Sequence, residues 1–216
     1  MDPSPHTTEP VWEDQHQLLA DLAVGDLRDG LDIRPTMVAF DAAGSLFLAT
    51  VRPFDKGRHH DAIIEVGALA MALRANRLAI SLGGRAWSRD DPIPPVLPDV
   101  GDLRQRVLVV HSVDAAAGRP ECRTTVWPVR GERGDDDVSL GDPVASDDGV
   151  GWVIDAMSIM VDPRNQEDVD EEEIGQQVIR CDRLGHQLAW SGPGLVRLDR
   201  AMTAHFGGPW LAGEAA

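Results

Sequence analysis

The chain of 216 residues has no tyrosine, and Lys56 is its only lysine. A Schiff base or a lysine-centred phosphate site would therefore have to use that one residue. The two cysteines, Cys122 and Cys181, lie far apart and form no Cys-x-x-Cys pair. The chain also lacks an initial basic segment followed by an apolar one, the pattern of a secretion signal. These absences predict a protein that folds without disulfide or metal and is not secreted.

Long apolar runs are missing as well. The longest runs from Ala62 to Leu73 and is interrupted by Glu65 and Gly67. It is shorter than the roughly 20 residues that a membrane-spanning helix needs. We therefore expect a cytoplasmic protein.

Acidic side chains dominate the charge of the chain. There are 36 acidic and 20 basic side chains, which give a formal charge of −16 at pH 7. Such a field repels phosphate backbones and anionic lipid surfaces. The expected partner is another protein or a second copy of the chain, with no nucleic acid and no membrane. No cofactor is expected.

Hydrophobic periodicity divides residues 11–130 into helices and strands. Two helices are expected, from Trp12 to Val24 and from Asp61 to Ala75. Five strands are expected, over residues 36–40, 46–51, 76–82, 106–113 and 122–129. The prolines between residues 88 and 102 predict an extended surface loop, because proline cannot continue a helix or an interior strand.

The remainder of the chain predicts a different organisation. Residues 131–151 are rich in glycine and aspartate, which is typical of a long loop or linker. Helices are compatible with residues 152–161, 171–190 and 195–206. The predicted domain map is a mobile arm (1–10), an α+β core domain (11–130), an acidic loop or linker (131–151), a C-terminal helical lobe (152–206) and a tail (207–216).

These elements predict an α+β fold with a mainly antiparallel five-stranded sheet, helices packed on it and further C-terminal helices. The order of elements is similar to the roadblock/longin and profilin-like arrangements, in which one antiparallel sheet carries helices on its faces. The similarity is one of topology, because the residues contain no motif of those families.

The sequence Arg58-His59-His60-Asp61, followed by Glu65, gathers side chains that bind divalent metals or transfer protons. His60-Asp61 resembles the dipeptide that names the HD phosphohydrolases, a resemblance of two residues. The functional interpretation makes His60, Asp61 and Glu65 catalytic candidates, and His59, His60 and Asp61 metal ligands. The competing interpretation, which we favour, is that Asp61 caps a helix and the histidines occupy an exposed loop.

Glu65 interrupts an otherwise apolar helix face. A carboxylate that becomes buried is costly unless it is paired or protonated, so a partner is expected if this helix face is covered, with Arg58 and Arg85 as the candidates. The functional interpretation is a site carboxylate with a perturbed pKa, whereas the interpretation that we favour is one polar stripe of an amphipathic helix.

Residues 83–88 follow a predicted strand and contain Arg85 and Trp87. A guanidinium and an indole beside exposed backbone can bind an anion, a carbonyl or a peptide, so these two residues are binding candidates. An ordinary turn explains the same residues, because no phosphate-binding glycine motif is present.

Two functions follow. The favoured one is a non-enzymatic protein–protein interaction or adaptor module, because no spacing in the chain matches an enzyme signature. The alternative is a small metal-dependent hydrolase that uses His59, His60, Asp61 and Glu65.

Overall fold

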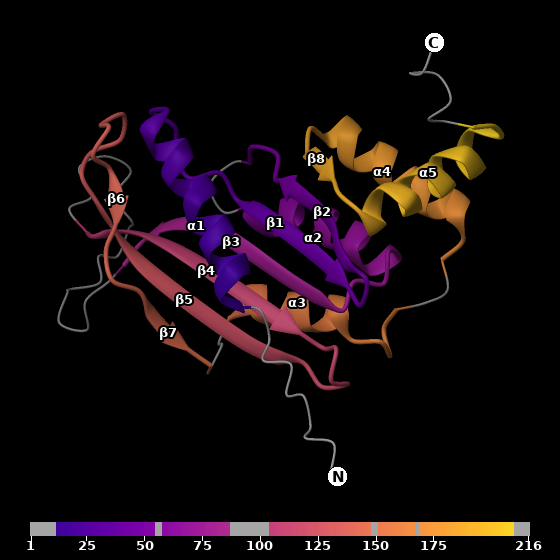
Figure 1. Ribbon diagram of the computed structural model, residues 1–216, viewed down its shortest axis with the longest axis horizontal. Coiled ribbons are helices and arrows are strands. Elements are labelled where there is room, and N and C mark those ends of the chain that lie inside the picture. Colours follow the sequence, from indigo (N-terminus) through magenta and orange to yellow (C-terminus); the bar gives the residue numbers. More distant parts are fainter. Residues whose placement is uncertain (1–11, 55–57, 87–103, 148–150, 167–168, 210–216) are drawn as a thin grey trace, which may run out of the picture.

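The computed structural model describes residues 12–54, 58–86, 104–147, 151–166 and 169–209. Within these ranges the chain forms five helices and eight strands (Figure 1). The helices are α1 (Trp12–Arg28), α2 (His59–Ala72), α3 (Trp152–Val161), α4 (Glu171–Leu184) and α5 (Pro193–Phe206). The strands are β1 (Thr36–Asp41), β2 (Gly44–Thr50), β3 (Arg77–Arg85), β4 (Arg106–Asp114), β5 (Glu121–Arg130), β6 (Ser139–Leu140), β7 (Val144–Ser146) and β8 (Gln187–Trp190).

All strand pairs are antiparallel, in the order β6-β5-β4-β3-β1-β2-β8, with β7 also paired to β5. The sheet curls into a half-barrel (Figure 1). The predicted α+β class and antiparallel sheet are confirmed. The predicted number of five strands is wrong, because β6, β7 and β8 also belong to the sheet.

Strand β8 lies in a segment for which the sequence predicts helix. Helix α4 ends at Leu184 because Gly185 takes the left-handed conformation (φ 92°) and its N–H bonds back to the helix. Residues 187–190 then pair with β2, from Thr50 opposite Gln187 to Phe47 opposite Trp190. A four-residue strand at a sheet edge carries too little periodicity to be recognised in sequence.

Strands β6 and β7 lie within the predicted acidic loop, residues 131–151. They contain only two and three residues, and both pair with β5. Val138 precedes β6 and is fully buried beside Leu27 and Val129. Val138 therefore anchors this otherwise polar segment to the apolar core.

Each face of the sheet has its own apolar core. Helix α1 covers one face, where Leu19 and Ala23 belong to a cluster with Leu108. Helices α2 to α5 cover the opposite face (Figure 1), and their larger cluster includes Leu69 and Met157. Residues from before and after the 131–151 segment share this larger core.

The division of the chain into a core domain, a linker and a C-terminal lobe is a statement about which parts fold independently. It stays a prediction. The arm over residues 1–10 and the proline-containing loop over residues 88–102 lie outside the described residues. Among the residues that are described, no helix is long and apolar enough to cross a membrane.

Candidate functional site

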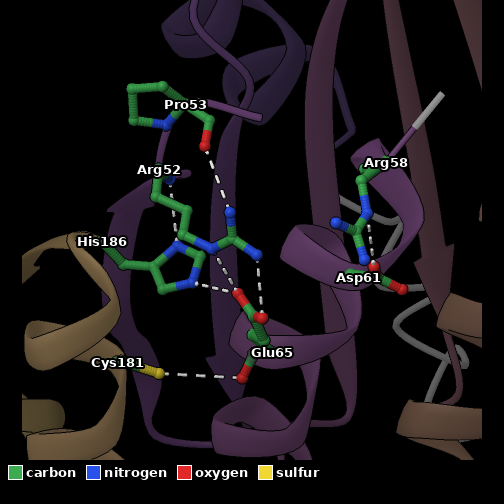
Figure 2. A network of polar contacts seen from close by, with 7 residues as sticks. All are labelled: Arg52, Pro53, Arg58, Asp61, Glu65, Cys181 and His186. Atoms are coloured by element: carbon green, nitrogen blue, oxygen red, sulfur yellow. Dashed lines mark hydrogen bonds and ion pairs between the residues drawn. The ribbon is translucent and has the colours of Figure 1, made fainter. Parts of the chain in front are cut away.

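Glu65 of α2 is the centre of a half-buried polar network (Figure 2). The Arg52 guanidinium donates two hydrogen bonds to its carboxylate, Nε to Oε2 at 2.7 Å and Nη2 to Oε1 at 2.9 Å. These bonds lower the pKa of Glu65, against the opposing effect of burial. Glu65 thus has the partner that burial demands. That partner is Arg52, at the end of β2, instead of the predicted Arg58 or Arg85.

His186 completes the network from the turn between α4 and β8. Its Nδ1 accepts a hydrogen bond from the Arg52 backbone N–H at 3.1 Å, so the proton of the neutral ring lies on Nε2. Nε2 then donates to Glu65 Oε2 at 3.0 Å (Figure 2). Burial lowers the pKa of His186, although the neighbouring Glu65 carboxylate opposes that shift. The neutral ring therefore connects the α4–β8 turn to the segment after β2 and to helix α2.

Cys181 lies beside this network on α4. Its thiol donates a hydrogen bond to the Glu65 backbone carbonyl, with Sγ and oxygen 3.7 Å apart. Burial raises the pKa of the Cys181 thiol to about 11. A thiol of that pKa is protonated at neutral pH, and only the thiolate is a strong nucleophile. Cys181, His186 and Glu65 together hold the structure and do not form an activated nucleophile.

The two predicted histidines lie at the first turn of α2. The His60 ring stacks on Trp152 of α3, with centroids 3.6 Å apart and an interplanar angle of 18°. The His59 ring lies 5.3 Å from Trp152, and its pKa is lowered by burial and then by His60. Phe54 lies 6.0 Å from His59, and all four rings are half-buried. These residues form an aromatic cluster on the surface.

Asp61 does not cap α2. The helix begins at His59, its N-cap position is Arg58, and the Arg58 side chain makes no capping hydrogen bond. Asp61 is in the first turn, where an acidic side chain favours the helix dipole. It is exposed and lies 3.7 Å from Arg58, which is also exposed.

The four candidate metal and catalytic residues point to two places. His59 and His60 turn toward Trp152, whereas Glu65 turns toward Arg52 and His186 (Figure 2). Among the described residues, no group of three or more His, Cys, Asp and Glu side chains is arranged to hold a metal ion.

The binding candidate Arg85 ends β3, and its Nη1 donates to the Arg104 carbonyl at 2.8 Å. It therefore ties together the two ends of the segment that follows β3. The other candidate, Trp87, lies outside the described residues.

A second buried network, under α1, has no counterpart in the sequence prediction. His16 Nε2 is hydrogen-bonded to Ser112 Oγ at 2.5 Å and Nδ1 to Thr125 Oγ1 at 2.9 Å. Burial, with a smaller effect of Arg123, lowers the pKa of His16 to about 4. Ser112 has an exposed fraction of 0%, so this Ser–His pair is closed to substrate. It anchors α1 to β4 and β5.

Comparison with protein-family models gave no match, and neither curated proteins nor solved structures gave a significant one. The topological similarity to roadblock/longin and profilin-like proteins accordingly stays a prediction.

Proposed function

We propose that this chain is a non-enzymatic binding module that contacts a partner protein through the face formed by α2 and α3. The observation that carries the proposal is the half-buried Trp152, stacked on His60 where the two helices begin. Tryptophan is among the residues most enriched at binding hot spots, because it offers a large rigid surface at low entropic cost.

Apolar side chains continue from this stack along both helices. Ile64 follows His60 by one turn and is 49% exposed, and Ile159 follows Trp152 by two turns and is 58% exposed. The helices pack closely where the Met160 side chain lies against Gly67, a position at which a β-carbon would overlap it. We call His60, Ile64, Trp152 and Ile159 the α2–α3 face. Its anchors lie on two rigid helices.

The charge of the chain indicates which partner fits this face. Asp61 and Asp155 are exposed in the first turns of α2 and α3, beside the stack. The net charge of −16 repels a second copy and attracts cations. We therefore expect a segment of another protein that carries both apolar and basic side chains.

The same contacts support binding over the hydrolase alternative. A hydrolase would need His59, His60 and Glu65 to converge, whereas the Glu65 carboxylate is held by Arg52 and His186. The histidine rings are held by Trp152.

The test compares three proteins immobilised in equal amounts and exposed to lysate of the native host. These are the parent, Ile159→Asp on the α2–α3 face, and Leu195→Asp on α5 as the matched control, since Leu195 is also exposed, at 44%. Bound proteins are quantified by mass spectrometry. We expect the captured amount of at least one basic protein to fall more than tenfold with Ile159→Asp. The Leu195→Asp variant should capture as much of that protein as the parent does. Equal profiles for all three would contradict the proposal.

A further inference from the structure

A groove of about 650 Å³ opens at the end of the sheet where β1 and β2 stop pairing. Its long walls are residues 31–35 and 50–54, and Gly185 and Gln187 line a third side. The last bond of the pair runs from Val51 N to the Pro35 carbonyl at 2.8 Å. A groove of this volume lies within the range of small-molecule sites.

The walls diverge because they are drawn to opposite faces of the sheet. Ile33 packs into the core under α1, whereas Arg52 turns to Glu65 on α2 (Figure 2). Each wall is thus held by its own half-buried side chain. The groove is a consequence of the fold at this end of the sheet.

The backbone of the walls has few hydrogen-bond donors left for a ligand. The N–H groups of Leu31 and Val51 bond to backbone carbonyls, and that of Arg52 bonds to His186. Proline at positions 35 and 53 has no N–H to offer. An added β-strand would find little to pair with, so recognition must come from side chains.

Those side chains are mostly apolar. Leu31 is 44% exposed, and Pro53 and Phe54 line the facing wall. An apolar lining with a few polar groups that set orientation is typical of sites for small ligands.

Arg34 supplies the charged group, and a buried carboxylate holds it in place. Its Nε and Nη2 donate to Asp26 Oδ1 at 2.9 and 2.6 Å, and its backbone N–H donates to Oδ2 at 2.9 Å. The Asp26 side chain is 8% exposed, while that of Arg34 is 50% exposed. Asp26 therefore fixes one edge of the guanidinium and leaves half of the side chain open to a ligand.

The other charged residues of the lining are turned elsewhere. The Arg52 guanidinium donates to Glu65 and to the Pro53 carbonyl (Figure 2). Asp32 is 2.7 Å from Arg133, which offsets its charge at the rim. Arg34 is also paired, with Asp26, but half of its side chain stays exposed in the lining, and a guanidinium is a preferred partner for carboxylates.

We propose that this groove binds an apolar carboxylate, a hydrocarbon body that ends in a carboxylate group, with Arg34 as the charged anchor. The apolar body lies along Leu31, Pro53 and Phe54. The groove adjoins the aromatic cluster through Phe54 but contains none of the four residues of the α2–α3 face, and it does not rest on the function proposed for that face. A free fatty acid and the C-terminus of an apolar peptide share the required chemistry.

The test uses decanoate, decanol, and a short leucine-rich peptide with either a free or an amidated C-terminus. Binding to the full chain is followed by NMR, through the amide resonances of Arg34, Val51 and Gln187. We expect saturable shifts with decanoate or with the free-acid peptide, and the tighter of the two identifies the source. Decanol and the amidated peptide should bind at least tenfold more weakly than the matching acid. Equal binding of acid and neutral forms, or no saturable shift with either acid, would overturn the proposal.

Two variants locate the site without removing the Asp26 partner. Leu31→Asp places a negative charge in the groove at an exposed position. It should lower the affinity for the acid ligand at least tenfold. Ile159→Asp on the α2–α3 face is the control and should leave that affinity unchanged. If Leu31→Asp has no effect, the proposal is wrong. The same pair separates the two proposals, because Leu31→Asp should retain the protein partner that Ile159→Asp loses.

Discussion

The two faces of the sheet are built differently, and each contains one buried neutral histidine. Under α1, His16 bonds to two hydroxyl groups, those of Ser112 and Thr125. On the opposite face, His186 bonds to a backbone N–H and to the ionised Glu65. Hydroxyl groups can turn to new partners when the ring is lost, whereas a backbone N–H and a carboxylate are held in position. The same residue type is therefore an adaptable anchor on one face and a rigid one on the other.

The space around the helix glycines also differs between the two faces. A β-carbon at Gly194 of α5 would overlap the Leu46 carbonyl of β2, so this helix lies directly on a strand backbone. A β-carbon at Gly25 of α1 would meet no atom within 4 Å. The helices opposite α1 thus include backbone-to-backbone contact, while α1 has space at its own glycine.

The largest expected effect is therefore at Gly194. Gly194→Ala should lower the free energy of unfolding by about 3 kcal/mol or more, because backbone atoms at Leu46 cannot move aside as a flexible side chain can. Gly25→Ala should raise it by about 0.5–1 kcal/mol, because alanine is the better helix former. Denaturant unfolding of both variants measures the difference. A Gly194→Ala protein as stable as the parent would show that α5 does not approach β2 so closely.

Acid should weaken both faces through their histidines. The pKa of His16 is lowered to about 4, from 6.5 in the unfolded chain, and that of His186 is lowered as well. The unfolded state then binds more protons, so the stability from neutral histidine is present above pH 6.5 and lost as the pH falls. For His16 the loss between pH 6.5 and 4 is of the order of 3 kcal/mol.

Unfolding free energies measured at several pH values test this expectation. His16→Gln cannot titrate, so its stability should fall less steeply than that of the parent between pH 6.5 and 4. The Glu65 carboxyl has a lowered pKa, so its contribution to stability is lost only as the pH falls below about 4.5, at the acid end of this window. Identical pH profiles for parent and variant would show that His16 is not held neutral.

The choice of substitution should separate the roles of His186. His186→Phe fills the space but leaves the Arg52 N–H without its acceptor, and should cost about 2–3 kcal/mol. His186→Gln can accept from Arg52 and donate to Glu65, so it should cost less than about 1 kcal/mol. Thermal and denaturant unfolding measure both values. Equal losses would mean that ring packing matters more than the two hydrogen bonds.

The smallest effects compare two acidic residues at helix starts. Asp170 caps α4, with its side chain accepting from the Glu173 N–H at 2.8 Å, whereas α2 has no side-chain cap. Asp170→Ala should therefore cost about 1 kcal/mol. Asp61→Ala should cost less than about 0.5 kcal/mol, as for other exposed charges. A larger loss at Asp61 than at Asp170 would restore Asp61 as a cap.

Local sequence patterns were sufficient for most of the regular structure. The β-favouring runs of the central hairpin and the apolar helix after it carry their signal within a few residues, so α1, α2 and β1 to β5 were predictable. The sequence also indicated that Glu65 would need a partner if its helix face were covered, because an unpaired buried carboxylate is costly. What the sequence alone determined was the class of fold.

Only the tertiary structure decided which residues meet. Arg52, Glu65 and His186 lie on three elements, and no sequence spacing links positions 65 and 186. β8 is a strand because the edge of β2 stabilises it, although its four residues carry little preference of their own. The stack of His60 on Trp152 and the groove beside Arg34 likewise depend on long-range packing. Contacts between distant segments come from the summed packing of the whole core, and local propensity contains no record of them.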